Sequence, residues 1–116
     1  MDQNKLLNII EEAQAAAKEA ATKCYTEVFE GIDSGACGFA WVEIWDFDGK
    51  RIKGNTKLGK QFKAAGIEQN YRRIFQIWDP AGLPVQNIDI KHVGAQAAAE
   101  VFKKHGFAAF AQSRLD

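Results

Sequence analysis

The stretch Cys37-Gly-Phe-Ala-Trp-Val-Glu-Ile-Trp45 decides the fold of this 116-residue chain. Side chains alternate between the two faces of a β-strand, so the stretch separates into two sets. One set is large and mostly aromatic: Phe39, Trp41, Glu43 and Trp45. The other is small or branched: Gly38, Ala40, Val42 and Ile44. We therefore predict a central strand whose small face lets helices approach closely, while its ring-bearing face meets something else.

Three helices are predicted around this strand. An apolar stripe rich in alanine recurs every three or four residues over 4–29, and a similar stripe covers 90–105 after a capping Asp89. A shorter lysine-rich helix is expected over 57–65, with Thr56 as its N-cap. The thin stripes of the two long helices match the small face of the central strand, so we place both helices there.

The other strands follow from turn residues and alternation. Asp48-Gly49 is typical of a tight hairpin turn, and the alternating side chains before Asp79-Pro80 indicate a further strand. The expected segments are 50–53, 71–78, 83–88 (an extended edge piece) and 107–112. The chain length fits one domain, residues 1–116. The result is an α+β fold: a small, mostly antiparallel sheet with two long helices packed on one face and one short basic helix.

The net charge is zero, but the charges are unevenly distributed. Residues 1–48 contain ten acidic and three basic side chains, whereas residues 49–75 contain one acidic and eight basic ones. Two explanations fit this pattern: the middle segment binds an external anion, or it neutralises the acidic first helix. The candidate residues for anion or nucleic-acid binding are Lys50, Arg51, Lys53, Lys57, Lys60, Lys63, Arg72 and Arg73.

The rings of Phe39, Trp41 and Trp45 form a second candidate surface. If no helix covers their side of the sheet, this aromatic patch is too large to remain in water. We expect it to be an interface with a second copy of the chain, or a face that holds a ligand.

The sequence contains only weak matches to phosphate-binding, catalytic and metal-binding motifs. Residues 54–60 fit the spacing G-x-x-x-x-G-K of phosphate loops, but Gln61 stands where Ser or Thr would bind magnesium. Cys37 and His92 form a candidate catalytic pair that lacks an orienting third group. Cys24 and Cys37 do not have metal-ligand spacing and are expected to be reduced, so we predict no metal and no cofactor.

Four segments together resemble a family of small phage-encoded proteins without a characterised function. They are Cys37-Gly-Phe-Ala-Trp-Val42, Ile77-Trp-Asp-Pro80, Val93-Gly-Ala-Gln-Ala-Ala-Ala-Glu-Val101 and Ser113-Arg-Leu-Asp116. The likeness spans most of residues 36–116 and leaves out the basic stretch 50–63. It implies a viral accessory protein that acts in the cytoplasm of a bacterial host, and it transfers no catalytic residue.

These observations lead to one leading hypothesis and two alternatives. The leading hypothesis is a non-enzymatic accessory protein that acts by binding, as a homo-oligomer joined through its aromatic or helical surface. No apolar run is long enough to cross a bilayer, so no membrane partner is expected. The first alternative is nucleic-acid or nucleotide binding through the basic segment 50–73. The second is a small enzyme that uses Cys37 and His92.

Overall fold

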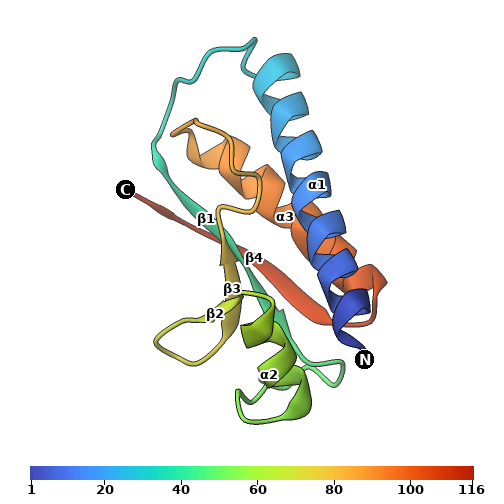
Figure 1. The fold of residues 1–116 in the computed structure, drawn as a ribbon. Helices are drawn as coiled ribbons and strands as arrows, with labels where there is room; N and C mark the ends of the chain where they lie inside the picture. The colour runs from blue at the N-terminus through green and yellow to red at the C-terminus, as the bar shows by residue number, and fades with distance from the viewer.

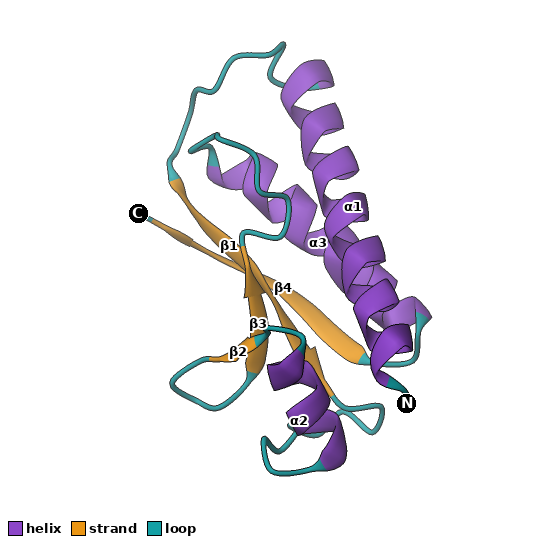
Figure 2. Cartoon of the chain, viewed as in Figure 1, coloured by secondary structure: helices purple, strands orange, loops and turns teal.

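The computed structural model describes all 116 residues, as three helices and one four-stranded sheet (Figures 1 and 2). The elements are, in chain order, α1 (Gln3–Glu27), β1 (Gly38–Trp45), α2 (Lys57–Ala64), β2 (Glu68–Gln69), β3 (Phe75–Trp78), α3 (Ile88–Lys104) and β4 (Ala108–Leu115). The predicted α+β fold is confirmed. None of the helices combines the length and the apolar character that a membrane crossing requires.

The sheet has the strand order β2-β3-β1-β4, and every neighbouring pair is antiparallel. From β1 onward the elements follow the order β-α-β-β-α-β, which with this strand order is the split βαβ arrangement. Helix α1 precedes it as an addition. In the register, Trp41 of β1 lies between Trp78 of β3 and Gln112 of β4. The stretch that decides the fold is therefore one of the two central strands, as predicted.

Both long helices lie on the same face of the sheet. Helix α3 packs across β1 and β4, and α1 runs along α3. The two helices approach closely because Gly94 of α3 has no side chain. A Cβ at this position would lie 2.9 Å from the Cβ of Ala81 and 3.3 Å from the carbonyl oxygen of Ala17 in α1.

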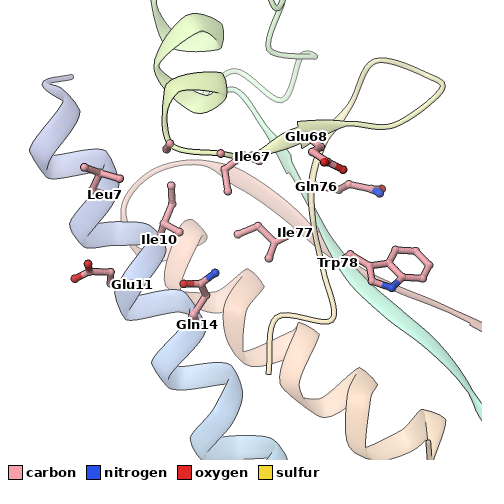
Figure 3. Close-up of a pocket in the computed structure, with 11 residues that line it drawn as sticks. Leu7, Ile10, Glu11, Gln14, Ile67, Glu68, Gln76, Ile77 and Trp78 are labelled. Carbon is pink, nitrogen blue, oxygen red and sulfur yellow. The ribbon is translucent and has the colours of Figure 1, made fainter. Parts of the chain in front are cut away.

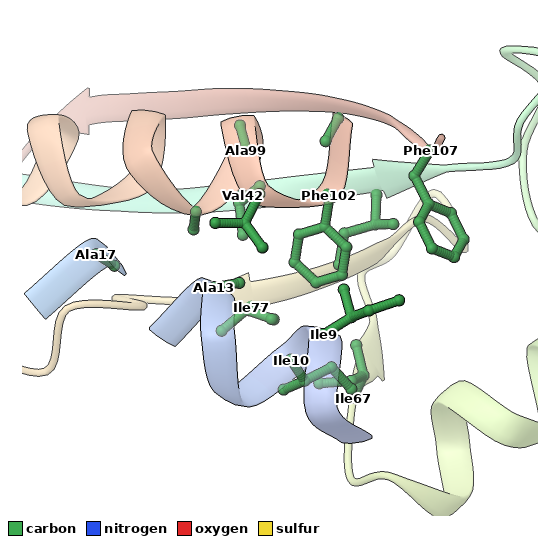
Figure 4. Packing of buried hydrophobic residues seen from close by; sticks show 14 of the residues in the cluster. Ile9, Ile10, Ala13, Ala17, Val42, Ile67, Ile77, Ala99, Phe102 and Phe107 are labelled. Carbon is green, nitrogen blue, oxygen red and sulfur yellow. The ribbon is translucent and has the colours of Figure 1, made fainter. Parts of the chain in front are cut away.

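The hydrophobic core fills the space between these helices and the sheet (Figure 4). The small face of β1 is fully enclosed, with Ala40 and Val42 completely buried and Ile44 nearly so. Side chains of α1 such as Ile9 and Ile10 meet Ile77 of β3 in the same cluster. Helix α2 closes one end of the core through Phe62, whose ring packs against Phe75 and Phe107. The alanine stripe of α3 packs on the small face of β1 as predicted, whereas the stripe of α1 packs mainly against α3.

The predicted strand at residues 50–53 is wrong. The tight turn itself is present, since the Gly49 amide donates to the Asp46 carbonyl and Gly49 has a φ of 80°. The Asp46 amide then donates to the Lys50 carbonyl, but the pairing stops there and the chain continues as a loop to α2. Of this lysine-rich segment only Ile52 is buried in the core, so a single apolar side chain anchors it and no alternating apolar face favours a strand.

The predicted strand at 71–78 is half as long in the structure, where only Phe75–Trp78 is extended. Residues 70–74 instead form the loop of a hairpin between β3 and the unpredicted two-residue strand β2. The carboxamide oxygen of Asn70 accepts hydrogen bonds from the Arg72 and Ile74 amides. These local bonds satisfy the backbone and compete with the sheet, although the sequence of the loop alternates like a strand.

Three further boundaries differ from the predictions. Helix α3 begins at Ile88 and is capped by Asn87, whose side chain accepts from the Ile90 amide, so Asp89 lies in the first turn and is not the cap. The segment 83–88 is not a strand, apart from one isolated bridge between Cys37 and Asn87. Strand β4 continues to Leu115, because its polar end pairs with the start of β1.

Candidate ligand-binding site

No helix covers the face of the sheet opposite the core, which is called the open face below. Its side chains come from all four strands, and Trp78 and Phe110 remain 47% and 49% exposed. Phe39, Trp41 and Trp45 are half-buried by their neighbours on the same face. The full set is Phe39, Trp41, Glu43 and Trp45 of β1, Glu68 of β2, Gln76 and Trp78 of β3, and Ala108, Phe110, Gln112 and Arg114 of β4.

A pocket of about 240 Å³ opens on this face and is called the aromatic pocket. The indole rings of Trp41 and Trp78 stack across β1 and β3, with centroids 5.2 Å apart and planes inclined by 11°. The loop that joins β2 to β3 also lines the pocket, including Tyr71, which is 94% exposed. The lining residues are Trp41, Glu43, Asn70, Tyr71, Arg72, Gln76, Trp78 and Arg114.

Glu43 is the most unusual member of this pocket, because a carboxylate lies buried among aromatic rings. The residue is only 4% exposed. Its Oε2 atom accepts a hydrogen bond from the indole N–H of Trp41 at 3.4 Å and one from the guanidinium of Arg72 at 3.3 Å. Its Oε1 atom has no hydrogen bond within the chain, so this acceptor is unused.

A second pocket, of about 490 Å³, is called the basic pocket. It lies between the loop before α2, the helix itself and the β2–β3 hairpin. The lining residues are Arg51, Lys53, Gly54, Asn55, Lys63, Gln69 and Arg73. Four of the seven are cationic and none is acidic. None of these four cations belongs to an ion pair in the structure.

Close packing between α2 and the preceding loop shapes the basic pocket. A Cβ at Gly59 would lie 2.1 Å from the carbonyl oxygen of Lys53, so only glycine lets the helix rest on this loop. Gly54 also has no side chain. The ammonium of Lys63, one turn after Gly59 in α2, can therefore lie against it. Thr56 caps the helix as predicted, accepting a hydrogen bond from the Gly59 amide at 3.1 Å.

The β2–β3 hairpin loop contributes to both pockets. Arg72 and Arg73 are neighbours in the chain, yet Arg72 lines the aromatic pocket and Arg73 the basic one. Arg73 has a φ of 62°, in the left-handed region that non-glycine residues rarely occupy. Its carbonyl oxygen accepts from the side chains of Gln69, at 3.1 Å, and Arg51, at 3.5 Å. The carbonyl of this strained residue therefore holds two other lining residues, Gln69 and Arg51, at the basic pocket.

The structure brings together half of the predicted basic residues. Arg51, Lys53, Lys63 and Arg73 line the basic pocket, and Arg72 is turned to the aromatic pocket. The remaining three, Lys50, Lys57 and Lys60, line neither pocket and are exposed. No ion pair joins any of the eight residues to α1 within the monomer, and neutralisation of α1 by the basic segment of a second copy stays a prediction.

The ion pairs of α1 go to α3 instead. The carboxylate of Glu12 contacts the ammonium of Lys104, and the Nε2 atom of His105 lies 3.0 Å from its Oε1. Hydrogen bonds from Lys104 first, and then from His105, hold the pKa of Glu12 below its ordinary value. This cluster lies at the far end of α3 from the first turn and joins the two long helices.

The candidate catalytic pair is not joined in the structure. Cys37 is exposed at the start of β1, and no hydrogen bond links its thiol to His92 of α3. The other thiol, Cys24, is half-buried, and desolvation raises its pKa. The two cysteines are not bonded to each other, and no cluster of three or more His, Cys, Asp or Glu side chains is arranged to hold a metal ion.

Arg114, near the end of β4, forms no ion pair with Asp116. The guanidinium of Arg114 lies 5.4 Å from the centre of the Phe39 ring, and the ammonium of Lys91 lies 5.5 Å from it. Both are within the range of cation–π attraction. The rim of the open face is therefore cationic, with Arg72, Arg114 and Lys91 beside its rings.

A third hollow lies on the core side of β3, against α1 (Figure 3). Ile77 points into it toward Ile10, while the ring of Trp78 points away from α1, to the other side of the strand. This hollow of about 460 Å³ mixes apolar and polar lining residues without any cation. It shares Gln76 and Trp78 with the aromatic pocket, across β3, and shares no lining residue with the basic pocket.

Sequence reasoning missed several residues of the aromatic pocket. Trp78, Glu43, Asn70 and Gln76 were not predicted as site residues. A signal for Glu43 was available, because it shares a strand face with three aromatic rings, where a carboxylate needs a specific partner. No sequence signal places Asn70 in the pocket, because it arrives there through the unpredicted hairpin.

Comparison with protein-family models, with curated proteins and with solved structures finds no match for this chain.

Proposed function

We propose that this chain is a non-enzymatic binding protein whose ligand is a nucleic acid or nucleotide, held through its phosphates in the basic pocket. The observation that carries the proposal is the group of four cations, Arg51, Lys53, Lys63 and Arg73, around one pocket without an acidic lining residue or an ion pair. Like charges repel, so an anion bound between these side chains lowers the electrostatic energy of the group. A hollow lined by charges of one sign also concentrates counter-ions from solution.

The shape of the basic pocket suits an extended anion better than a single small ion. Its cations come from three separate segments: the loop before α2, the helix, and the β2–β3 hairpin. Guanidinium groups bind phosphate through two parallel N–H donors, and lysine adds a compact charge. The side-chain amides of Asn55 and Gln69 supply further donors in the same hollow.

The proposal is tested by fluorescence anisotropy with a short labelled single-stranded DNA, a matching RNA and ATP, at low salt. Lys63→Glu is expected to weaken binding on the order of tenfold and to reduce the salt dependence of the affinity. Lys57→Glu is the matched control, since it makes the same charge change on α2 outside the pocket, and a change below about twofold is expected. Equal effects of the two variants, or no binding of any probe by the wild type, would contradict the proposal.

A second candidate function is self-association through the open face. The exposed rings of Trp78 and Phe110 favour it. Light scattering across a concentration series tests it, and a monomer at all concentrations would exclude it. The resemblance to small phage-encoded proteins and a place in the bacterial cytoplasm stay predictions.

A further inference from the structure

We propose that the aromatic pocket takes an unpaired base of the same single strand whose phosphates occupy the basic pocket, and that Glu43 selects bases with an amino group. This inference rests on the proposed function and adds the kind of nucleic acid and the part of it that is recognised. Four observations carry it: the aromatic walls, the cationic rim, the unused carboxylate oxygen and the shared hairpin.

The walls of the aromatic pocket suit a flat ring system. Trp41 and Trp78 form a stacked pair, and the almost fully exposed Tyr71 lines the same pocket. Aromatic side chains on the two central strands of a four-stranded sheet form a platform on which unpaired bases stack. Base-paired nucleic acid keeps its rings inside the duplex, so this platform requires a single strand.

The charge at the rim decides between a nucleic acid and a second copy of the chain. Arg72, Arg114 and Lys91 lie beside the rings, whereas the acidic side chains of this face are Glu43, which is buried and engaged by Arg72, and Glu68 on the edge strand β2. Two such faces pressed together would bring cations against cations. A strand of nucleic acid supplies bases that can stack on the rings of this face. Its phosphates supply the negative charge that balances the cations of the rim.

Glu43 gives the pocket a means of discrimination. A carboxylate only accepts hydrogen bonds, and Oε1 of Glu43 has no partner within the chain. Cytosine presents an amino group at the position where uracil and thymine present a carbonyl oxygen. A carboxylate attracts the first and repels the second, so cytosine is expected to bind more tightly than uracil.

The two pockets are close enough for one strand because they share a loop. Gln69 and Arg73 line the basic pocket, whereas Asn70, Tyr71 and Arg72 line the aromatic pocket. Consecutive Cα atoms are about 3.8 Å apart, so Arg72 and Arg73 reach the two pockets from almost the same point of the backbone. A strand that crosses this loop places a base on one side and a phosphate on the other.

The test exploits the fact that all three tryptophans of the chain, Trp41, Trp45 and Trp78, lie on the open face. Their fluorescence therefore reports this face alone. Oligo(dC), oligo(dU) and an abasic oligonucleotide of equal length are titrated, with anisotropy following binding and tryptophan emission following stacking. We expect all three to bind, the base-bearing ones to quench the emission, and oligo(dC) to bind more tightly than oligo(dU).

Single substitutions test which side chains of the open face contact the base. Trp78→Ala is expected to weaken oligo(dC) binding by about tenfold and to leave the abasic oligonucleotide unaffected. Phe110→Ala is the matched control, because Phe110 is equally exposed on the same face but outside the pocket. Glu43→Gln is expected to remove the preference for oligo(dC) over oligo(dU), with abasic binding as the check that the fold is intact.

The outcomes separate this inference from the proposed function. Equal affinity for the abasic and base-bearing strands, without quenching, would contradict base binding in the aromatic pocket. Phosphate binding in the basic pocket would remain supported. Binding of base-bearing strands without any binding of the abasic strand overturns the basic pocket instead. A stable dimer whose tryptophans do not respond to oligo(dC), or equal effects of Trp78→Ala and Phe110→Ala, also overturns this inference.

Discussion

Trp41 and Trp78 stack almost in parallel across the two central strands, with their ring centroids 5.2 Å apart. The third tryptophan, Trp45, instead meets Phe110 edge-on at 83°. The stacked pair exists only when β1 and β3 are paired in the observed register, since Trp41 and Trp78 are direct cross-strand partners. The wall of the aromatic pocket is thus a product of the sheet and not of either strand alone.

This stack predicts a non-additive optical signal. Two parallel indoles at this distance couple, so the near-ultraviolet circular dichroism should contain a contribution that disappears in either Trp41→Phe or Trp78→Phe. The double variant is then expected to change little beyond each single one, whereas Trp45→Phe adds independently. Additive changes from Trp41 and Trp78 would contradict the stacked arrangement.

Asn70 is predicted to hold both pockets in shape. Its side-chain oxygen accepts from the amides of Arg72 and Ile74, which fixes the loop that separates the pockets. Asn70→Ala removes these bonds, and we expect a loss of about 1–2 kcal/mol in stability together with weaker binding of abasic and base-bearing strands alike. Asn70→Asp keeps the acceptor and should retain the loop. Chemical denaturation and anisotropy measure the two effects, and a loss confined to one class of strand would argue against this role.

Gly94 is predicted to be required for the contact between α1 and α3. Gly94→Leu forces a side chain into the space occupied by Ala81 and the Ala17 carbonyl, and overpacking of this kind costs about 1–3 kcal/mol. Gln96→Leu introduces the same side chain at an exposed position two residues further along α3 and should be nearly neutral. Urea unfolding of both variants measures the difference, and similar stabilities would show that the helices are less tightly packed.

Glu12 should make a pH-dependent contribution to stability. Its pKa is lowered in the folded chain by Lys104 and then His105, so its stabilising effect is present above the ordinary glutamate pKa and is lost as the pH falls through the lowered value. Glu12→Gln is therefore expected to be slightly less stable than the wild type near pH 7, and this gap is expected to be smaller near about pH 3. The effect is small, because the pair is exposed to solvent.

Thermal unfolding at the two pH values measures this contribution. Glu11→Gln serves as the control, since Glu11 neighbours Glu12 on α1 but forms no ion pair. A stability gap between wild type and Glu12→Gln that persists at low pH would show that the substitution acts by some route other than the charge.

The elements with a strong apolar period could be predicted from the sequence. The alternation in β1 and the alanine stripes of α1 and α3 place apolar side chains on one face of each element. Each of these faces is buried in the structure, so the pattern alone indicates the element. The hairpin loop could not be predicted, because Tyr71 to Ile74 alternates like a strand. Its turn depends on the side chain of Asn70 and on a left-handed Arg73, where glycine would be the expected residue.

The sequence indicated which kinds of residue form the candidate site, but it did not indicate how they are arranged in space. The excess of cations in the middle segment is real, yet adjacent residues of a turn point in different directions, so Arg72 and Arg73 separate into two pockets. Likewise, the rings of β1 indicated an open face, but the contribution of Trp78 required the register of β3 against β1. Long-range pairing, which local patterns do not encode, assembled both pockets.

The central claim, that one single strand occupies both pockets across the β2–β3 hairpin, is tested most directly by chemical-shift mapping of the isotope-labelled protein with oligo(dC). We predict that the indole N–H signals of Trp41 and Trp78 shift together with the backbone amides of Gly54 and Arg73, while the amides along the outer face of α1 stay in place. Shifts confined to one pocket, or shifts centred on α1 with both indoles unchanged, would contradict the account.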